Sequence, residues 1–237
     1  MDIRGLAVTL GQTQVLRNLD LTLASGEARV ILGPNGAGKS TFFNTLSGLV
    51  KPRSGSIHIG GQSVIGKSPH LLARHFITRS FQVPQLSPDL SAAEHIRLAL
   101  ASPCAVREKE RWTPERLRAS TSGVLNSFHL AHLADVFPSA MTHAERKILD
   151  VAIAMSRTMP ILLLDEAVAG LGPAEKDFMR TLVLRHVGKA TIILIEHDTD
   201  FIAGLGLPIL FMDQGRFLFE GSFSDVECRA KEADVYF

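Results

Sequence analysis

A glycine-rich segment that ends in lysine and serine constrains this 237-residue chain more than any other feature. Residues 33–40, Gly-Pro-Asn-Gly-Ala-Gly-Lys-Ser, fit the pattern G-x-x-x-x-G-K-[ST], in which backbone N–H groups and a helix N-terminus surround phosphate oxygens. The pattern works only between a buried strand and a helix. Residues 28–32 form a continuous apolar run, and residues 40–49 carry apolar side chains at helical spacing. The sequence therefore predicts a strand–loop–helix unit that binds phosphate.

Two further apolar runs end in polar side chains. Residues 161–164 lead into Asp165 and Glu166, and residues 191–195 lead into an acid followed by His197. Ligands of open α/β sheets collect at the carboxyl ends of strands. A strand that simply exits into solvent would show the same letters, and it is the glycine loop that favours a site. We expect Asp165 to hold Mg²⁺ through water, Glu166 to orient and polarise an attacking water, and His197 to contact a γ-phosphate.

The remaining patterns predict an α/β fold with a helical insert. Alternating residues over 3–23 indicate antiparallel strands, and a hairpin over 57–64, turning at two glycines, extends that layer. Helical spacing dominates 90–158. A helical pattern around 178–187 separates the two apolar runs described above, which gives a βαβ order. A closing hairpin over 209–219 precedes a polar helical tail.

Composition and charge exclude several classes of function. With 25 Lys and Arg against 24 Asp and Glu, the net charge of +1 gives no reason to expect a nucleic-acid or anionic-membrane partner. Cys104 and Cys228 lie far apart, so neither a disulfide framework nor a zinc site is indicated. The longest apolar stretch, 201–212, is broken by glycine and proline and is shorter than the roughly 20 residues of a spanning helix. The first residues lack the apolar run of a secretory signal, so we expect a cytoplasmic protein.

With these residues in place, the chain resembles the ATP-binding subunit of ABC transporters over nearly its whole length. The resemblance implies ATP and Mg as cofactors and hydrolysis of ATP coupled to transport. The residues implied to bind the nucleotide are Gly33, Pro34, Asn35, Gly36, Ala37, Gly38, Lys39, Ser40, Thr41 and Gln82. The implied metal ligands are Ser40, Gln82 and Asp165, and the implied catalytic residues are Glu166 and His197.

The same resemblance implies the fold. We expect an α/β P-loop NTPase core of mainly parallel sheet, with an antiparallel β layer and an inserted helical subdomain. The chain, 1–237, is then a single ATP-binding domain. Its expected subdomains are the β layer with the phosphate-loop core (1–82), the helical subdomain (83–158), and the rest of the core with the closing hairpin and helix (159–237).

Several segments are similar, more narrowly, to the importers of branched-chain amino acids and urea. These segments are Gly33-Pro34-Asn35-Gly36, Phe81-Gln82, Ala169-Gly170-Leu171, Glu196-His197-Asp198 and Asp213-Gln214-Gly215-Arg216. Lipopolysaccharide-export subunits share several of them. The resemblance implies transmembrane permease subunits that meet residues 82–94 and a second ATP-binding subunit, in a homodimer or a heterodimer. It implies no nucleic acid, and membrane association only through the permease, at the cytoplasmic face of the inner membrane.

The chain departs from the family at its signature segment. The family's LSGGQ falls on Met141 followed by Thr142, His143, Ala144 and Glu145, so threonine replaces serine and alanine replaces the key glycine. In the family this segment meets the γ-phosphate held by the opposite subunit, and an added methyl group opposes that close approach. The same residues also fit a capping box, S/T-x-x-E, and the two roles are compatible.

Other departures concern the base and the neighbourhood of the catalytic residues. Leu10 stands where the family usually has an aromatic side chain that stacks on adenine. Ala167 replaces a proline, and Gly172 replaces the usual Asp or Asn. These departures leave adenine contact and coupling between the subunits open.

Three functions remain to be compared. The favoured one is an ATPase subunit that dimerises around MgATP and drives a separate permease; beside a paralogue with an intact signature, its two sites would be unequal. The alternative is a nucleotide-gated dimerising module with little or no hydrolysis. A small-molecule kinase is disfavoured, because Gln82, the helical insert and His197 would each need an unrelated explanation.

Overall fold

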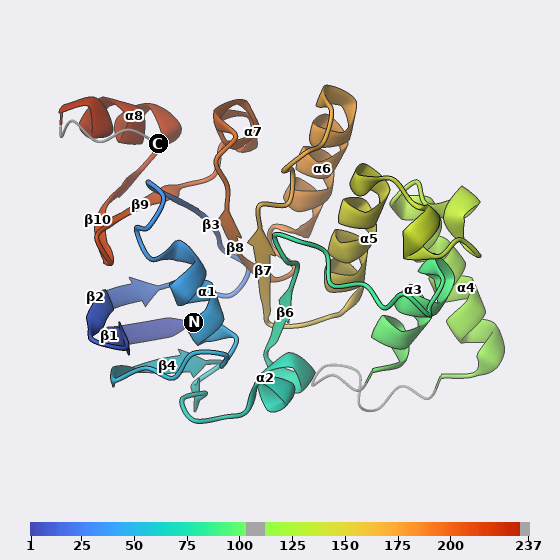
Figure 1. Ribbon diagram of the computed structural model, residues 1–237, viewed down its shortest axis with the longest axis horizontal. Coiled ribbons are helices and arrows are strands. Elements are labelled where there is room, and N and C mark those ends of the chain that lie inside the picture. The colour runs from blue at the N-terminus through green and yellow to red at the C-terminus, as the bar shows by residue number, and fades with distance from the viewer. Residues whose placement is uncertain (103–111, 233–237) are drawn as a thin grey trace.

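Two β-sheets form the framework of the chain, of which the computed structural model describes residues 1–102 and 112–232 (Figure 1). In this described part, one sheet has the order β2-β1-β4-β5 and the other the order β10-β9-β3-β8-β7-β6. The strands are β1 (Asp2–Leu10), β2 (Thr13–Thr22), β3 (Ala28–Leu32), β4 (Ser54–Ile59), β5 (Gln62–Ser63), β6 (Ile77–Arg79), β7 (Ile161–Asp165), β8 (Thr191–Ile195), β9 (Ile209–Asp213) and β10 (Arg216–Gly221).

The smaller sheet is the antiparallel layer that the sequence predicts. β1 pairs with β2 on one edge and with β4 on the other, both antiparallel. The hairpin from β4 to β5 turns at Gly60 and Gly61, which have φ of 56° and 77°, values that glycine adopts readily. The predicted hairpin is therefore confirmed, and it extends the layer as expected.

The larger sheet is mainly parallel and buried on both faces. β3 pairs in parallel with β8 and β9, β7 pairs in parallel with β6 and β8, and only β10 runs antiparallel to its neighbour β9. Successive side chains enter two different cores: Val30 and Leu32 belong to one, and Ile31 to the other. This double burial explains the continuous apolar runs and confirms the predicted α/β fold.

The helices separate onto the two faces of that sheet. They are α1 (Lys39–Leu46), α2 (Pro69–His75), α3 (Ala92–Ala101), α4 (Pro114–Ser127), α5 (His143–Ser156), α6 (Pro173–His186), α7 (Thr199–Leu205) and α8 (Phe223–Glu232), with short 3₁₀ turns at Ala131–Leu133 and Pro138–Ala140. α1 packs with the smaller sheet in one core, whereas α5, α6 and α7 contribute to the other.

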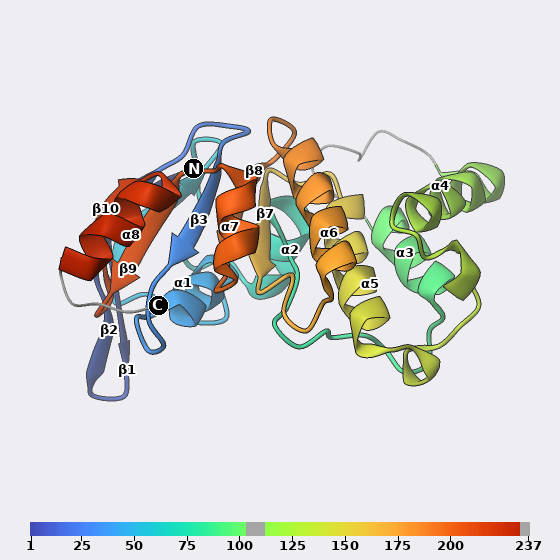
Figure 2. The ribbon, with the colours of Figure 1, turned by 90° about the horizontal axis from the view of Figure 1, so that it is seen from above.

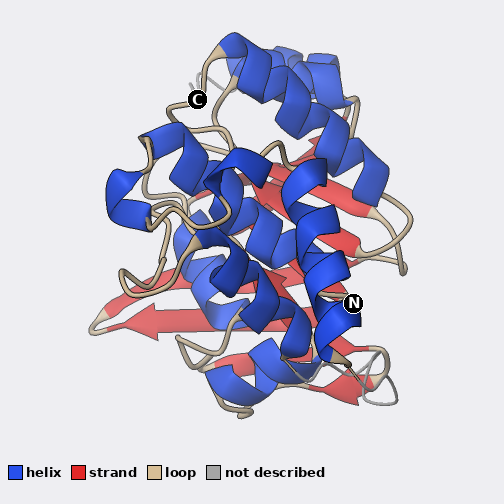
Figure 3. Cartoon of the chain, turned by 90° about the vertical axis from the view of Figure 1, so that its right-hand side faces the viewer, coloured by secondary structure: helices blue, strands red, loops and turns tan. Residues whose placement is uncertain are grey.

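The helical insert lies at one end of the molecule. α3 and α4 are at the opposite end from β1 and β2 (Figures 1 and 2), and a view from that end shows helices in front of strands (Figure 3). α3 contacts both α4 and α5, so α5 joins the insert to the sheet. No helix among the described residues is long and apolar enough to cross a membrane.

The structure differs from the sequence expectations at short elements. α1 ends at Leu46 rather than near Leu49, because Gly48 has φ of 74° and breaks the helix. α2, β6 and α7 were not anticipated; they have 7, 3 and 7 residues. Cys104 lies outside the described residues, whereas Cys228 is exposed on α8.

Candidate functional site

The glycine-rich loop joins β3 to α1 at the carboxyl edge of the larger sheet. A Cβ on Gly33 would lie 1.9 Å from the carbonyl oxygen of Met212, so no side chain fits at that position. Gly38 caps α1 with φ of 107°, a left-handed conformation that favours glycine. The first backbone N–H groups of α1 have no partner within the helix, and they follow directly on the loop. Sequence and geometry thus place an anion-binding helix end where the pattern predicts it.

The ammonium of Lys39 lies inside this loop. Its Nζ donates to the carbonyl oxygens of Gly33 at 2.6 Å and Pro34 at 2.9 Å. Burial lowers the pKa of Lys39, and the nearby carboxylates of Glu166 and Asp165 oppose that shift. The lysine therefore lies within electrostatic reach of both acids at the end of β7. Ser40 is exposed in the first turn of α1.

Asp165, the last residue of β7, is paired with an arginine that the sequence did not single out. Arg79 Nη2 donates to Asp165 Oδ2 at 2.7 Å, and the two side chains are only 9% and 7% exposed. Arg79 Nη1 also donates to Asn44 Oδ1 on α1 at 2.8 Å. The guanidinium lies 5.4 Å from the ring of Phe43 and 5.1 Å from that of Phe81. Arg79 thus links the helix of the phosphate loop to the carboxylate predicted to hold the metal.

Glu166 lies between two of the other predicted site residues. Gln82 Nε2 donates to Glu166 Oε2 at 2.9 Å, and His197 Nε2 is 3.4 Å from Glu166 Oε1. The backbone of Glu166 has φ of 48°, which costs a non-glycine residue of order 1 kcal/mol. A hydrogen bond from its N–H to the Ile195 carbonyl at 2.8 Å holds that conformation. The strain directs the carboxylate of Glu166 toward Gln82 and His197.

Burial shifts the pKa values of His197 and Glu196, which lie next to each other in the chain. Burial lowers the pKa of His197, and the charge of Lys39 lowers it further, against Glu166 and Asp165. The imidazole is therefore neutral near pH 7 and carries a single N–H. Burial raises the pKa of the adjacent Glu196 to about 7, although its carboxylate accepts the backbone N–H of Val168 at 3.0 Å.

The signature segment lies elsewhere, at the N-terminus of α5. Thr142 Oγ1 accepts the N–H of Glu145 at 3.2 Å, and Glu145 Oε2 accepts the N–H of Thr142 at 2.7 Å, so the predicted capping box is confirmed. The ring of His143 lies against Gly170, where a Cβ would be 2.9 Å from its Cδ2. Ala144 packs against the core of the helical face. The side chain of Glu145 also lies 3.7 Å from Nε2 of His132.

Two charged residues of α5 are buried beside the site. Lys147 is 0% exposed and Asp150 is 5% exposed. Burial lowers the pKa of Lys147, and burial raises that of Asp150 to about 6. Sequence reasoning missed both. Their signal was the i, i+3 spacing of two charges on the face of α5 that also carries Val151 and Ala154.

The donor set at this edge fits magnesium and a nucleotide phosphate. The hydroxyl of Ser40, the carboxylate of Asp165 and the amide oxygen of Gln82 are hard oxygen donors of the kind that Mg²⁺ takes. The described residues contain no group of three or more His, Cys, Asp or Glu that could hold a metal ion. Phosphate loop, strand-end acids and parallel sheet together define a P-loop nucleotide-binding domain.

Comparison with known proteins gives the family. The family model described as "ABC transporter" matches residues 16–169. The thiamine import ATP-binding protein ThiQ of Brucella abortus is 31% identical, over 97% of this chain and 92% of that protein. The branched-chain amino acid transport ATP-binding protein BraF of Pseudomonas aeruginosa is 29% identical, over 94% of this chain and 91% of that protein. The chain therefore belongs to the ABC transporter family, as an ATP-binding domain, and it is an ATPase.

Solved structures agree on the fold. A nucleotide-free ATP-binding cassette from an ABC transporter superposes with a TM-score of 0.83 at 22% identity, covering 100% of this chain and 99% of that one. A dimeric cassette bound to ADP and Pi superposes with a TM-score of 0.82 at 23% identity, covering 94% and 98%. These similarities support the ABC ATPase type of P-loop fold that the sequence resemblance implies.

Proposed function

We propose that this chain is the ATP-binding subunit of a membrane importer and hydrolyses MgATP at its own phosphate loop. The observation that carries the proposal is the arrangement of Glu166 between Gln82 at 2.9 Å and His197 at 3.4 Å. This group lies within electrostatic reach of Lys39, which the glycine loop encloses. Phosphate binding, a base for water and a contact for the γ-phosphate are thus within one edge of the sheet.

Each residue has a chemical task in hydrolysis. Lys39 and the N–H groups at the start of α1 hold the phosphates by charge and by hydrogen bonds. Glu166 accepts a hydrogen bond from the attacking water and orients it in line with the γ-phosphorus. His197, neutral at pH 7, donates a hydrogen bond to a γ-phosphate oxygen. Ser40, Asp165 and Gln82 would hold magnesium, which would supply positive charge against the phosphates.

The signature segment acts, in this proposal, on the nucleotide of a partner subunit. We place Thr142, His143, Ala144 and Glu145 against the nucleotide of the opposite ATP-binding subunit, with Ala144 weakening that contact. In a heterodimer with a paralogue that has an intact signature, this chain's phosphate loop faces the intact signature and forms the more active site. The paralogue's phosphate loop faces the altered signature. Unequal turnover at the two sites follows.

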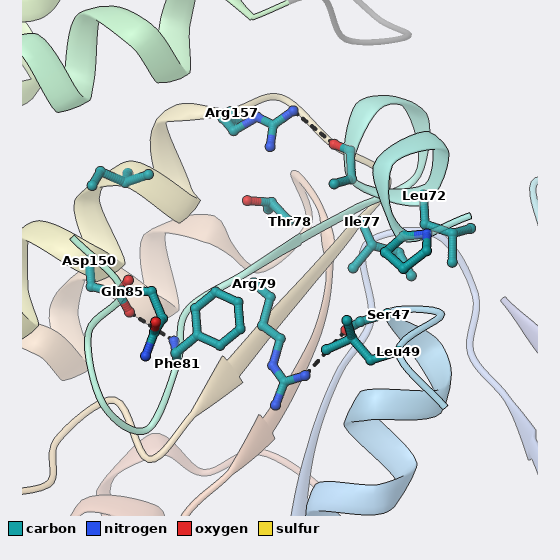
Figure 4. A pocket seen from close by; sticks show the side chains of 13 residues that line it. Ser47, Leu49, Leu72, Ile77, Thr78, Arg79, Phe81, Gln85, Asp150 and Arg157 are labelled. Atoms are coloured by element: carbon teal, nitrogen blue, oxygen red, sulfur yellow. Dashed lines mark hydrogen bonds between the residues drawn. The ribbon is translucent and has the colours of Figure 1, made fainter. Parts of the chain in front are cut away.

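A groove beside Gln82 fits a segment of the permease. It is a cavity of about 290 Å³ between α2, β6 and α5, with Phe81, Gln85 and Asp150 on one wall and Ser47 and Leu49 on the other (Figure 4). Leu49 is 58% exposed at its rim. The groove touches Arg79 as well as Phe81, so a permease segment seated there lies one residue from Gln82.

The solute that we propose for this importer is a small polar organic molecule. The segments shared with importers of branched-chain amino acids and urea favour that class, and BraF supports it. ThiQ, at similar identity, makes thiamine the competing solute. Uptake of labelled leucine, urea and thiamine by cells lacking this chain, with and without its restoration, separates the three.

The test of the function is MgATP hydrolysis by the purified chain beside Glu166→Gln, alone and with any ATP-binding paralogue encoded next to it. We expect Glu166→Gln to reduce turnover by about 100-fold or more, because a positioned base contributes that much, with ATP affinity retained. Glu115→Gln, an exposed glutamate in the first turn of α4, is the matched control. ATP binding without turnover in every mixture would instead support a nucleotide-gated dimerising module.

A further inference from the structure

Lys147 and Asp150 are charged, buried, and not used by the mechanism above. Both lie on the inner face of α5, 0% and 5% exposed. Burying an ammonium and a carboxylate is unfavourable unless hydrogen bonds and mutual attraction compensate for the lost hydration. The partners of these two side chains therefore indicate what they do.

Those partners are the backbone groups on either side of Gln82. Lys147 Nζ donates to the carbonyl oxygens of Phe81 at 2.8 Å, Gln82 at 3.0 Å and Asp165 at 3.3 Å. An ammonium has three donors, so this set engages all of them. Asp150 Oδ2 accepts the N–H of Phe81 at 2.8 Å, which Figure 4 shows beside the groove. Phe81 is thus held by α5 through both its N–H and its carbonyl.

The same helix carries the signature segment at its N-terminus. Thr142 caps α5, and Lys147 follows five residues later, about 7.5 Å along the axis at 1.5 Å per residue. One helix therefore binds the backbone of Gln82 and of Asp165 and also carries the signature segment, which we place against a partner subunit. Gln82 is thus hydrogen-bonded to Glu166 through its side chain and to Lys147 of α5 through its carbonyl oxygen.

We propose that Lys147 and Asp150 are positioning residues that clasp the Phe81–Gln82 segment to α5, so that this segment and the signature move as one body. The clasp itself rests on the hydrogen bonds above. Its effect on turnover rests on the proposed function.

A purely structural ion pair is the competing explanation, and it predicts a different result. Loss of a structural pair weakens the whole domain, whereas loss of a clasp releases residues 81–85 and leaves the rest protected. Lys147→Met removes the three donors with little change in volume. Lys147→Met with Asp150→Asn removes both charges together, which limits the penalty of leaving one buried charge unpaired. Lys147→Arg keeps a charged donor.

The experiment is amide hydrogen exchange on the full chain, followed by mass spectrometry of peptides covering 80–86, α5 and β1. In Lys147→Met and in the double variant we expect residues 81–85 to exchange about tenfold faster or more, since several hydrogen bonds of roughly 1 kcal/mol each are lost. We expect β1 to stay unchanged and Lys147→Arg to remain close to wild type. Lys189→Met, at an exposed lysine between α6 and β8, is the control.

Two outcomes overturn the clasp. One is wild-type exchange over 81–85 in the double variant. The other is acceleration of 81–85 and β1 by the same factor in every variant, which is the behaviour of a structural pair. Exchange needs no turnover, so a wild-type chain that does not hydrolyse ATP refutes the proposed function without touching the clasp. If both hold, ATP turnover by Lys147→Met falls while its affinity for ATP stays the same.

Discussion

Glu166 shows how a single residue is prepared for chemistry. Its φ of 48° is unfavourable for a side chain with a Cβ, yet the conformation persists because Ile195 accepts its N–H and Gln82 binds its carboxylate. A carboxylate fixed in this way loses little entropy when a water molecule binds to it. Under the proposed function, the strained backbone holds Glu166 in the orientation that hydrolysis requires.

Leu10 provides a prediction at the scale of the residue. It lies at the end of β1, 46% exposed, at the position where the family resemblance implies an aromatic platform for adenine. We expect Leu10→Tyr to tighten ATP about fivefold, because an aromatic stack contributes roughly 1 kcal/mol. Titration with a fluorescent ATP analogue measures it, and Leu184→Tyr, at a 42% exposed leucine of α6, is the control. An unchanged affinity in Leu10→Tyr would place adenine elsewhere.

Residues whose roles depend on local sequence were predictable, and those that depend on distant backbone were not. The glycine loop, Asp165, Glu166 and His197 stand next to buried strands, and that context identified them. Arg79 binds Asp165, which is 86 residues away in the chain. Lys147 and Asp150 both bind Phe81, from 66 and 69 residues away. Their letters alone resemble ordinary surface charges on a helix or at a strand end.

At the scale of the element, the N-terminus of α5 is stabilised by a capping box. The reciprocal bonds between Thr142 and Glu145 satisfy backbone N–H groups that the helix leaves free. Ala144 adds a methyl group on the same turn. The helix that follows Thr142 is therefore well capped.

Removal of this cap has a measurable consequence. We expect Thr142→Ala to reduce the free energy of unfolding by about 1 kcal/mol, because the side-chain acceptor at the cap is lost. Thr142→Ser keeps the hydroxyl and should stay close to wild type. Urea unfolding followed by far-ultraviolet circular dichroism compares the three proteins. Equal midpoints for Thr142→Ala and wild type would mean that the cap contributes nothing.

Elements with an unbroken apolar run were easier to predict than elements without a clear hydropathy pattern. β3, β7 and β8 each fill both faces with apolar side chains, so a continuous run identified them. β6 has only 3 residues, too few to show any period. α7 lies inside an apolar stretch and ends at Gly206, with φ of 61°, so helix and strand could not be separated by hydropathy.

At the scale of the whole molecule, Glu196 makes stability depend on pH. Its pKa is raised by burial from 4.5 to about 7, so between these values the folded chain holds a proton that the unfolded chain has lost. Stability from this group is complete below pH 4.5 and is lost as the pH rises through about 7. Asp150, with its pKa raised to about 6, acts in the same direction.

We therefore expect Glu196→Gln to gain stability relative to wild type as the pH rises from 5 to 8. The gain is up to about 1.4 kcal/mol per pH unit, the value for one proton. Urea unfolding at four pH values in this range measures it. Glu115→Gln, exposed on α4, should run parallel to wild type. A constant difference between Glu196→Gln and wild type would show that Glu196 does not titrate in this range.

The edge of the larger sheet gathers its site from segments that the ribosome makes at widely separated times. The phosphate loop emerges first, and His197 is added only after most of the chain has been synthesised. β8 lies between β3 and β7, so a nascent chain that stops before Thr191 lacks the strand that brings Lys39 and Glu166 together. A nucleotide that binds through both Lys39 and Glu166 therefore stabilises only chains in which β8 has been inserted.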